Sequence, residues 1–173
     1  MYKYVIKDLM AAGRYLPHTL VFAVVLMVVI VGINHKRREK GKVPVRVLPT
    51  TFFIAYGFLV LLMTFLSRSE VGYTGIDLRL FSSFGINRRN NAYIIENILL
   101  FIPLGFGGAW VGAARNVFLS FLLGAGISFF IESMQYAAGR GVFQLDDIMT
   151  NTVGMVIGCM TFGVCNLLFR RRR

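Results

Sequence analysis

The sequence predicts an all-α polytopic membrane protein, a bundle of about five transmembrane helices. Of its 173 residues, 56% are hydrophobic and 16% are charged, whereas soluble domains average about 45 to 50% apolar and about 25% charged residues. Five apolar blocks are each long enough to cross the roughly 30 Å of a bilayer's hydrocarbon core, and most basic residues lie between these blocks. The composition argues against a soluble globular domain, and it is far too apolar for a disordered chain.

Each predicted span is an apolar run that ends where polar residues interrupt it. The first span is the plainest, because no polar side chain occurs in residues 21–31. The last three spans carry polar residues inside or at the ends of apolar helices, and these exceptions are informative. The sixteen residues before the first span fit either a short helix in the membrane interface or a frayed polar tail. The five predicted spans are residues 17–34, 49–66, 94–114, 116–136 and 147–169.

The positions of the 19 basic residues, which give a net charge of +11, set the expected orientation. Residues 35–46, between the first two spans, hold six Lys or Arg against the single Glu39, and short basic loops stay in the cytoplasm. Five alternating spans then place Arg115 and the arginines of residues 170–173 on the same side. We therefore expect a multi-pass protein of the cell membrane with its N-terminus outside and its C-terminus in the cytoplasm. Basic residues distributed in this way do not indicate a nucleic-acid partner.

Glycines of the later spans recur at a spacing that favours close helix packing. Small residues four apart let helix backbones approach closely in lipid. We therefore expect the glycines to pack the third, fourth and fifth spans together. They are Gly108 and Gly112, Gly124 and Gly126, and Gly154 and Gly158.

The sequence predicts neither a metal site nor a cofactor. Cys159 and Cys165 lie six residues apart in the last span, so they do not share a helix face and do not form a disulfide or metal-ligand pattern. The two histidines, His18 and His35, flank the first span and lie away from the acidic residues of the later spans. We interpret the cysteines as small apolar side chains.

Polar side chains gather at one end of the predicted bundle, opposite the basic loop. Glu132 and Gln135 are three apart and Asp147 and Asn151 are four apart, so each pair shares a helix face. The connection at residues 137–145 is short, so a helical hairpin would place the two pairs opposite each other. A carboxylate buried among apolar helices is costly unless it is paired, and an ionisable residue inside a membrane therefore suggests a functional site.

These side chains divide into candidate catalytic and candidate ligand-binding residues. Glu132 and Asp147 are the candidate catalytic acids. Arg68 and Arg140 are the available counter-charges, and a guanidinium suits bidentate pairing with a carboxylate or with a ligand phosphate. The structural alternatives are that Asp146 or Asp147 only caps the last helix, or that the polar groups only bond neighbouring helices. The candidate ligand-binding residues are Arg68, Asn97, Gln135, Arg140, Asp146 and Asn151.

Three sequence motifs occur together in the second half of the chain. They are NILLFIPLGF at residues 97–106, ESMQ at residues 132–135 and RGVFQLDDIMTNTVGMVIG at residues 140–158. In this combination the chain resembles the VanZ-like family of membrane proteins over residues 52–169. The resemblance implies a bacterial envelope protein with its signature residues at one membrane face, and it links the chain to low-level resistance to glycopeptide antibiotics of the teicoplanin type.

The resemblance divides the chain into an N-terminal segment, residues 1–46, with an extra transmembrane helix and the basic loop, and a VanZ-like four-helix domain, residues 47–173. The leading hypothesis is lowered susceptibility to glycopeptides through an outward-facing polar site whose partner is a membrane lipid or a lipid-linked cell-wall precursor. One alternative is a membrane-embedded enzyme acting on a lipid-linked or head-group substrate, with Glu132 as general acid or base. The other is a non-catalytic membrane scaffold. The sequence leaves this choice and the oligomeric state open.

Overall fold

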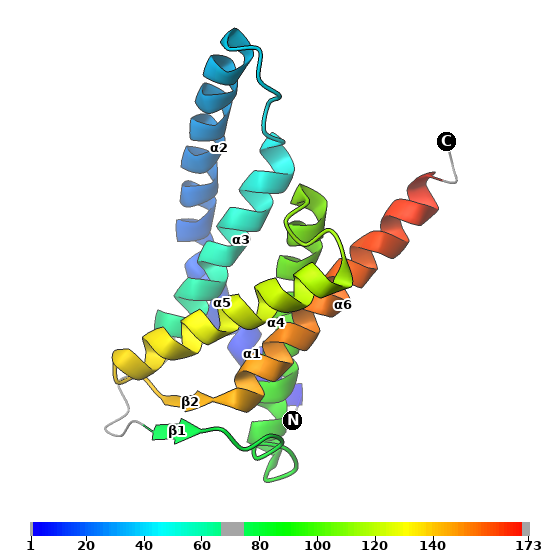
Figure 1. The fold of residues 1–173 in the computed structure, drawn as a ribbon. Coiled ribbons are helices and arrows are strands. Elements are labelled where there is room, and N and C mark those ends of the chain that lie inside the picture. The colour runs from blue at the N-terminus through cyan, green and yellow to red at the C-terminus, as the bar shows by residue number, and fades with distance from the viewer. Residues whose placement is uncertain (1, 67–74, 171–173) are drawn as a thin grey trace.

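The computed structural model describes residues 2–66 and 75–170, which form long helices and two short strands (Figure 1). The prediction of an essentially all-α fold is confirmed. In chain order the elements are α1 (Tyr2–Ala12), the 3-10 turn η1 (Gly13–Tyr15), α2 (Leu16–Glu39), α3 (Val47–Leu66), β1 (Gly75–Asp77), α4 (Arg88–Val111), α5 (Val117–Ala137), β2 (Val142–Gln144) and α6 (Leu145–Arg170).

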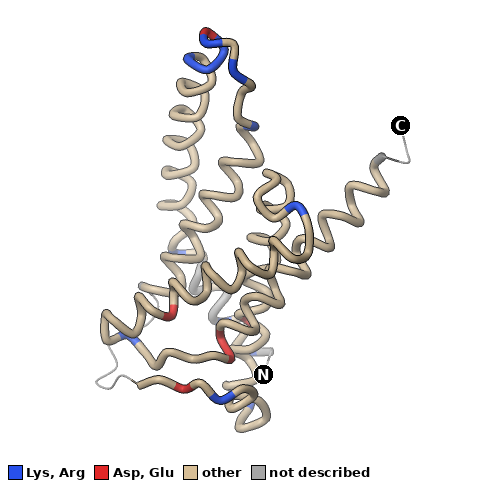
Figure 2. Tube along the Cα trace, in the orientation of Figure 1, with Lys and Arg blue, Asp and Glu red and all other residues tan. Residues whose placement is uncertain are grey.

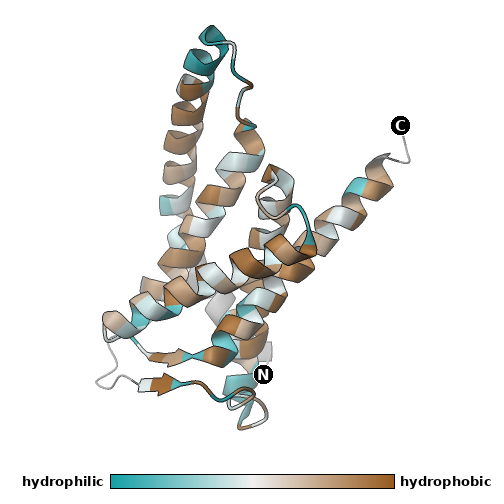
Figure 3. Cartoon of the chain, viewed as in Figure 1, coloured by the Kyte–Doolittle hydropathy of each residue, from teal (hydrophilic) through white to brown (hydrophobic). Residues whose placement is uncertain are grey.

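Five helical segments in the described part of the chain are long and apolar enough to cross a membrane, which confirms the predicted number of spans. Hydrophobic residues cover most of their length, and hydrophilic positions concentrate near their ends (Figure 3). Each predicted block overlaps one of these segments. The segments are Gly13–Glu39, Val47–Phe65, Arg88–Val111, Val117–Ala137 and Leu145–Phe169.

The third span is displaced from its predicted limits of residues 94–114 because local caps fix where α4 begins and ends. The Asn87 side chain accepts hydrogen bonds from the backbone N–H groups of Arg89 and Asn90, which starts the helix six residues early. At the other end Gly112 adopts φ 95°, a left-handed conformation that suits glycine and closes the helix. Hydropathy alone does not detect either cap.

The N-terminal segment is helical, which favours the first of the two alternatives for residues 1–16. Helix α1 continues through η1 into α2, and it packs against α4. Val5 is buried, whereas Ile6 and Met10 are exposed. A helix with its own exposed apolar side chains is consistent with a position in the membrane interface.

The closest helix crossing lies between α4 and α6, and glycine makes it possible. A Cβ atom on Gly154 would collide with the backbone carbonyl of Ile98, and one on Gly158 would collide with that of Ile102. Gly105 on α4 makes the reciprocal approach to the backbone of Met155. The predicted packing role of the Gly154 and Gly158 pair is therefore confirmed.

The other predicted packing glycines behave less uniformly. Gly124 lies against Thr152 and Met155 of α6, as expected. The expectation was wrong for Gly112 and Gly126, because a Cβ atom at either position would meet nothing within 4 Å. Gly112 instead ends α4, and Gly126 lies on an open face of α5.

The core of the bundle forms where α3, α4, α5 and α6 converge. Phe101 and Met155, both fully buried, lie at its centre. The Tyr56 hydroxyl of α3 donates to the Leu100 carbonyl of α4 at 3.0 Å, which satisfies the polar end of a ring that packs on this core. The buried core side chains are Val60, Phe101, Leu104, Ala114, Ile131 and Met155.

The two ends of the bundle differ in charge and in structure. Lys and Arg gather at the turn between α2 and α3, while most acidic positions lie at the opposite end (Figure 2). At that acidic end β1 and β2 form a parallel pair, with Gly75 opposite Val142 and Asp77 opposite Gln144. The sequence did not predict this ribbon, and residues 137–145 were expected to be only a short loop.

Candidate functional site

Polar side chains from three helices meet inside the bundle near the β1–β2 ribbon, and we call them the polar cluster. Most of them are buried, although the helices around them are apolar: Glu132 is 2% exposed, Gln135 1% and Asn151 4%. Buried polar groups require hydrogen-bond partners, so their contacts define what the cluster can do. The polar cluster comprises Asn97 of α4, Ser128, Glu132 and Gln135 of α5, and Asp147, Thr150 and Asn151 of α6.

One set of bonds joins α4 to α6. The Asn97 amide nitrogen donates to Asp147 Oδ1 at 3.0 Å and lies 3.5 Å from the Thr150 hydroxyl oxygen. The Thr150 hydroxyl in turn donates to the Asp146 carbonyl, 2.9 Å away within its own helix. Asn97 and Asp147, which were predicted to converge, are therefore in direct contact, and the Asp147 carboxylate receives a neutral amide donor.

A second bond joins α5 to α6. The Asn151 amide nitrogen donates to the Ser128 hydroxyl oxygen at 2.8 Å. The other end of the same amide, Asn151 Oδ1, is buried and accepts no hydrogen bond from any described residue. A buried acceptor without a donor costs about 1–3 kcal/mol, so this oxygen is suited to receive a donor from a bound molecule or a water.

The α5 residues of the ESMQ motif reach elements on either side of their helix. Glu132 Oε2 accepts the backbone N–H of Gln144 at 3.1 Å, which links α5 to strand β2. The Gln135 amide nitrogen donates to the Thr64 carbonyl of α3 at 2.8 Å. The predicted hairpin does bring α5 and α6 together, and Ser128, one turn from Glu132, makes a side-chain hydrogen bond with α6.

Arg140 has a different partner from the one expected. Its guanidinium donates to the Phe65 carbonyl at 2.6 Å and lies over the Phe65 ring, 4.5 Å from the centroid. Within residues 2–66 and 75–170 it forms no ion pair with a carboxylate. The turn after α5 carries its side chain toward the end of α3, so the prediction that Arg68 or Arg140 is the counter-charge of the cluster acids is not met by Arg140 and stays a prediction for Arg68. The other candidate, Arg68, lies outside the described residues.

Asp146 fastens the loop after β1 to the first turn of α6. Its carboxylate accepts the backbone N–H groups of Phe81 at 2.6 Å and Ser83 at 2.8 Å, and the Ser82 hydroxyl at 3.3 Å. These donors hold Phe81 at φ 63°, a left-handed conformation that is costly for an aromatic residue and persists only when the surroundings impose it. Ligand binding by Asp146 stays a prediction.

Asp77 continues this network outside the membrane-spanning segments. Hydrogen bonds from the Arg79 side chain and backbone, and from the Ser82 hydroxyl, lower the pKa of the Asp77 carboxyl to about 2. The Ser82 hydroxyl lies within bonding distance of both Asp77 and Asp146. Two carboxylates therefore share one loop, and the loop is tied to both the ribbon and α6.

The chemistry of the polar cluster is that of a site for hydrogen-bonding groups. It combines acid, amide and hydroxyl side chains, all of which exchange hydrogen bonds with polar molecules. Among the described residues, no group of three or more His, Cys, Asp or Glu is placed to hold a metal ion. The Ser128 hydroxyl neighbours an amide, whereas a serine nucleophile is activated by an adjacent base.

Three of the contacts named above involve groups that sequence reasoning did not assign to the site. Ser128 precedes Glu132 by four residues and so shares its helix face, a signal that was present in the sequence. Thr150 lies one position from Asn151 and was not named among the candidate residues. The backbone N–H of Gln144 depends on the path of the loop, which no side-chain pattern encodes.

Comparison with known proteins identifies the family. Neither the curated proteins nor the solved structures gave a match. The model of the VanZ/LLP1 family matches residues 19–167, which include most of α2 as well as all the helices of the polar cluster. The predicted boundary at residue 46 lies inside the matched range and stays a prediction. With most of its length matched, the chain belongs to the VanZ/LLP1 family.

Proposed function

We propose that this membrane protein lowers the susceptibility of a bacterial cell to glycopeptide antibiotics of the teicoplanin type. It does so by binding a lipid-linked or cell-wall ligand at the polar cluster. The observation that carries the proposal is Asn151 Oδ1, a buried acceptor with no donor among the described residues, in a cluster built from three helices. Membership of the VanZ/LLP1 family supports a role in the envelope.

The proposal includes an orientation for the cluster. The basic turn at residues 35–46 lies at the opposite end of the bundle from the β1–β2 ribbon (Figures 1 and 2). Basic loops stay in the cytoplasm, so the cluster faces outward, where cell-wall precursors and glycopeptides meet. In this orientation the N-terminus lies outside the cell and the C-terminus lies in the cytoplasm.

The test measures teicoplanin susceptibility in a susceptible host that produces the chain. Asn151→Leu removes the open acceptor and the amide donor, so protection is expected to be lost at unchanged protein abundance. Asn166→Leu is the matched control, because Asn166 lies on the same helix, is exposed and is remote from the cluster. The proposal fails if the unaltered chain gives no protection, or if Asn151→Leu protects as well as Asn166→Leu at equal abundance.

A membrane-embedded enzyme is the second candidate, and two buried acids on neighbouring helices favour it. Glu132 and Asp147 are 2% and 8% exposed, and such carboxyl groups serve as general acids or bases. Glu132→Gln keeps the size of the side chain and an oxygen that accepts the Gln144 N–H. An enzyme loses turnover of the lipid-linked substrate in this variant while still binding it, whereas a binding protein shows no turnover in either form.

A further inference from the structure

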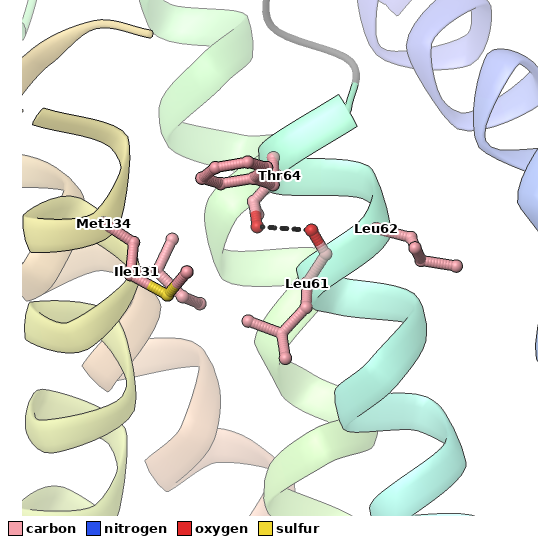
Figure 4. Close-up of a pocket in the computed structure, with 6 residues that line it drawn as sticks. Leu61, Leu62, Thr64, Ile131 and Met134 are labelled. Atoms are coloured by element: carbon pink, nitrogen blue, oxygen red, sulfur yellow. Dashed lines mark hydrogen bonds between the residues drawn. The ribbon is translucent and has the colours of Figure 1, made fainter. Parts of the chain in front are cut away.

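An apolar groove runs along the bundle between α3 and α5, two of the helices that are apolar enough to cross a membrane. Its larger part, about 600 Å³, is lined by α2, α3, α4 and α5, and a smaller part of about 220 Å³ continues between α3 and α5 alone. Leu61 and Ile131 line both parts, so the two hollows adjoin. Figure 4 shows these two residues among those that line the smaller part. Binding sites for small molecules have volumes of this order, about 300–1,000 Å³.

The wall of this groove offers no hydrogen-bonding group. Thr64 is its polar lining side chain, and its hydroxyl donates to the Val60 carbonyl at 2.8 Å within α3. The other lining residues are aliphatic, aromatic, glycine or methionine. Inside a membrane the available molecules that match such a wall are hydrocarbon chains.

Two glycines line the groove, and one of them, Gly126, has open space beside it. Gly57 of α3 and Gly126 of α5 both line the larger part of the groove. Gly126 contrasts with Gly154 and Gly158, which allow two backbones to touch, because a Cβ atom on Gly126 would meet nothing within 4 Å. Helix packing therefore does not require glycine at position 126, whereas an open groove does.

A cation lies at the end of the groove nearest the polar cluster. The smaller hollow ends at Thr64 and Phe65, whose carbonyls accept Gln135 and Arg140. In the described part of the chain the Arg140 guanidinium contacts the Phe65 carbonyl and ring but no carboxylate. Its remaining N–H donors match the oxygens of a phosphate.

The length of the groove fits the chain of a single-leaflet lipid. Met134 lines one end and Leu122, twelve residues earlier on α5, lines the other. Twelve helical residues rise about 18 Å, which is close to the thickness of one leaflet, about 15 Å of a roughly 30 Å hydrocarbon core. We infer that the groove between α3 and α5 holds one acyl chain of a membrane phospholipid whose phosphate lies at Arg140.

This inference deepens the proposed function by identifying a resident lipid beside the polar cluster. Only the biological role of the bound lipid rests on that function. The binding of the acyl chain in the groove does not depend on what the polar cluster binds. A lipid at the groove would carry polar head-group atoms to the cluster along the Gln135 and Arg140 side of α5. The test of lipid binding in the groove therefore uses no antibiotic and no resistance phenotype.

The test uses the full-length chain in vesicles of phosphatidylglycerol that contain a trace of the same lipid with a diazirine near the end of one acyl chain. After irradiation, labelled peptides are identified by mass spectrometry. Labelling is expected in the groove around Ile54, Phe58 and Leu122, severalfold above that at the exposed Leu167 and Leu168 of α6, which report ordinary boundary lipid.

Two pairs of variants distinguish this site from boundary lipid. Gly126→Phe fills the groove and should reduce groove labelling to the level at α6, while Gly163→Phe, at an α6 glycine that also has open space, should not. Arg140→Gln should weaken retention of phosphatidylglycerol by about tenfold, the value of one charge-assisted hydrogen bond, and Arg140→Lys should restore part of it.

Three outcomes overturn the inference: equal labelling of groove and α6, groove labelling unchanged by Gly126→Phe, or loss of groove labelling when undecaprenyl phosphate equimolar with the labelled lipid is added to the phosphatidylglycerol vesicles. If Gly126→Phe fails to fold, Gly126→Leu and the Arg140 pair carry the same test. Loss of groove labelling together with a teicoplanin effect that still depends on Asn151 would refute the lipid site and leave the proposed function standing. Groove labelling as expected, together with a teicoplanin effect that does not depend on Asn151, would refute the proposed function alone.

Discussion

Replacing Gly158 by alanine tests the α4–α6 crossing on which the polar cluster depends. The added Cβ atom would collide with the backbone carbonyl of Ile102 and lie 2.7 Å from the backbone nitrogen of Phe106. Because both neighbours are backbone atoms, no side-chain rotation relieves the clash, and the helices must separate. Asn97 on α4 and Asp147 on α6, which are joined by a 3.0 Å hydrogen bond, would move apart with them.

The expected cost follows from two opposing effects. Overpacking a closely packed contact costs typically about 1–3 kcal/mol, and a backbone clash belongs at the upper end of this range. Alanine in place of glycine within a helix returns about 1 kcal/mol of helix propensity. We therefore expect Gly158→Ala to lower the free energy of unfolding by about 2 kcal/mol.

The fluorescence of Trp110, the single tryptophan of the chain, reports this change during unfolding in detergent. Trp110 lies on α4 beside the rings of Phe52 and Phe106, so separation of the bundle alters its surroundings. Gly163→Ala is the matched control on α6, since a Cβ atom there meets nothing within 4 Å, and it should be neutral or slightly stabilising. Equal stability of Gly158→Ala and Gly163→Ala would refute the close crossing.

Three further predictions concern orientation and the loop after β1. Arg38→Cys in a cysteine-free background should react with a membrane-impermeant thiol reagent only after cells are opened, and labelling of intact cells would reverse the orientation. Asp146→Ala should speed amide hydrogen exchange at Phe81 and Ser83 severalfold, because it removes their acceptor, while exchange in the centre of α6 stays unchanged. Ionised Asp77 stabilises the loop above the ordinary pKa of 3.8, and this contribution should disappear as the pH falls toward its folded pKa of about 2. Amide exchange at Arg79 measures that loss in detergent, and Asp77→Asn should abolish the pH dependence.

Hydropathy predicted the spans of this fold because the bilayer imposes one rule on all of them. A spanning segment must be helical, long and apolar, so the run at residues 21–31 was sufficient to locate α2. The limits of α4 depend on a different property, the side-chain cap at Asn87 and the left-handed backbone at Gly112. Such local geometry moves a boundary by several residues without changing the apolar character of the span.

The β1–β2 ribbon was not predictable in the same way. Each strand has three residues, which is too short to display an alternating pattern, and Gly75 pairs with Val142 across 67 positions of the chain. The two strands meet because of how α3, α4 and α5 are arranged in space, and a local sequence pattern does not encode this arrangement. Arg140 illustrates the same difficulty, because its direction depends on the turn that ends α5 and not on its distance from the acids in sequence.

The two adjacent acids of α6 show how one helical turn can serve two purposes. Successive residues of an α-helix point about 100° apart, so Asp146 and Asp147 cannot face the same neighbour. Asp146 accepts three donors from the loop after β1, while Asp147 accepts Asn97 inside the bundle. One helical turn therefore holds the loop after β1 through Asp146 and reaches into the polar cluster through Asp147.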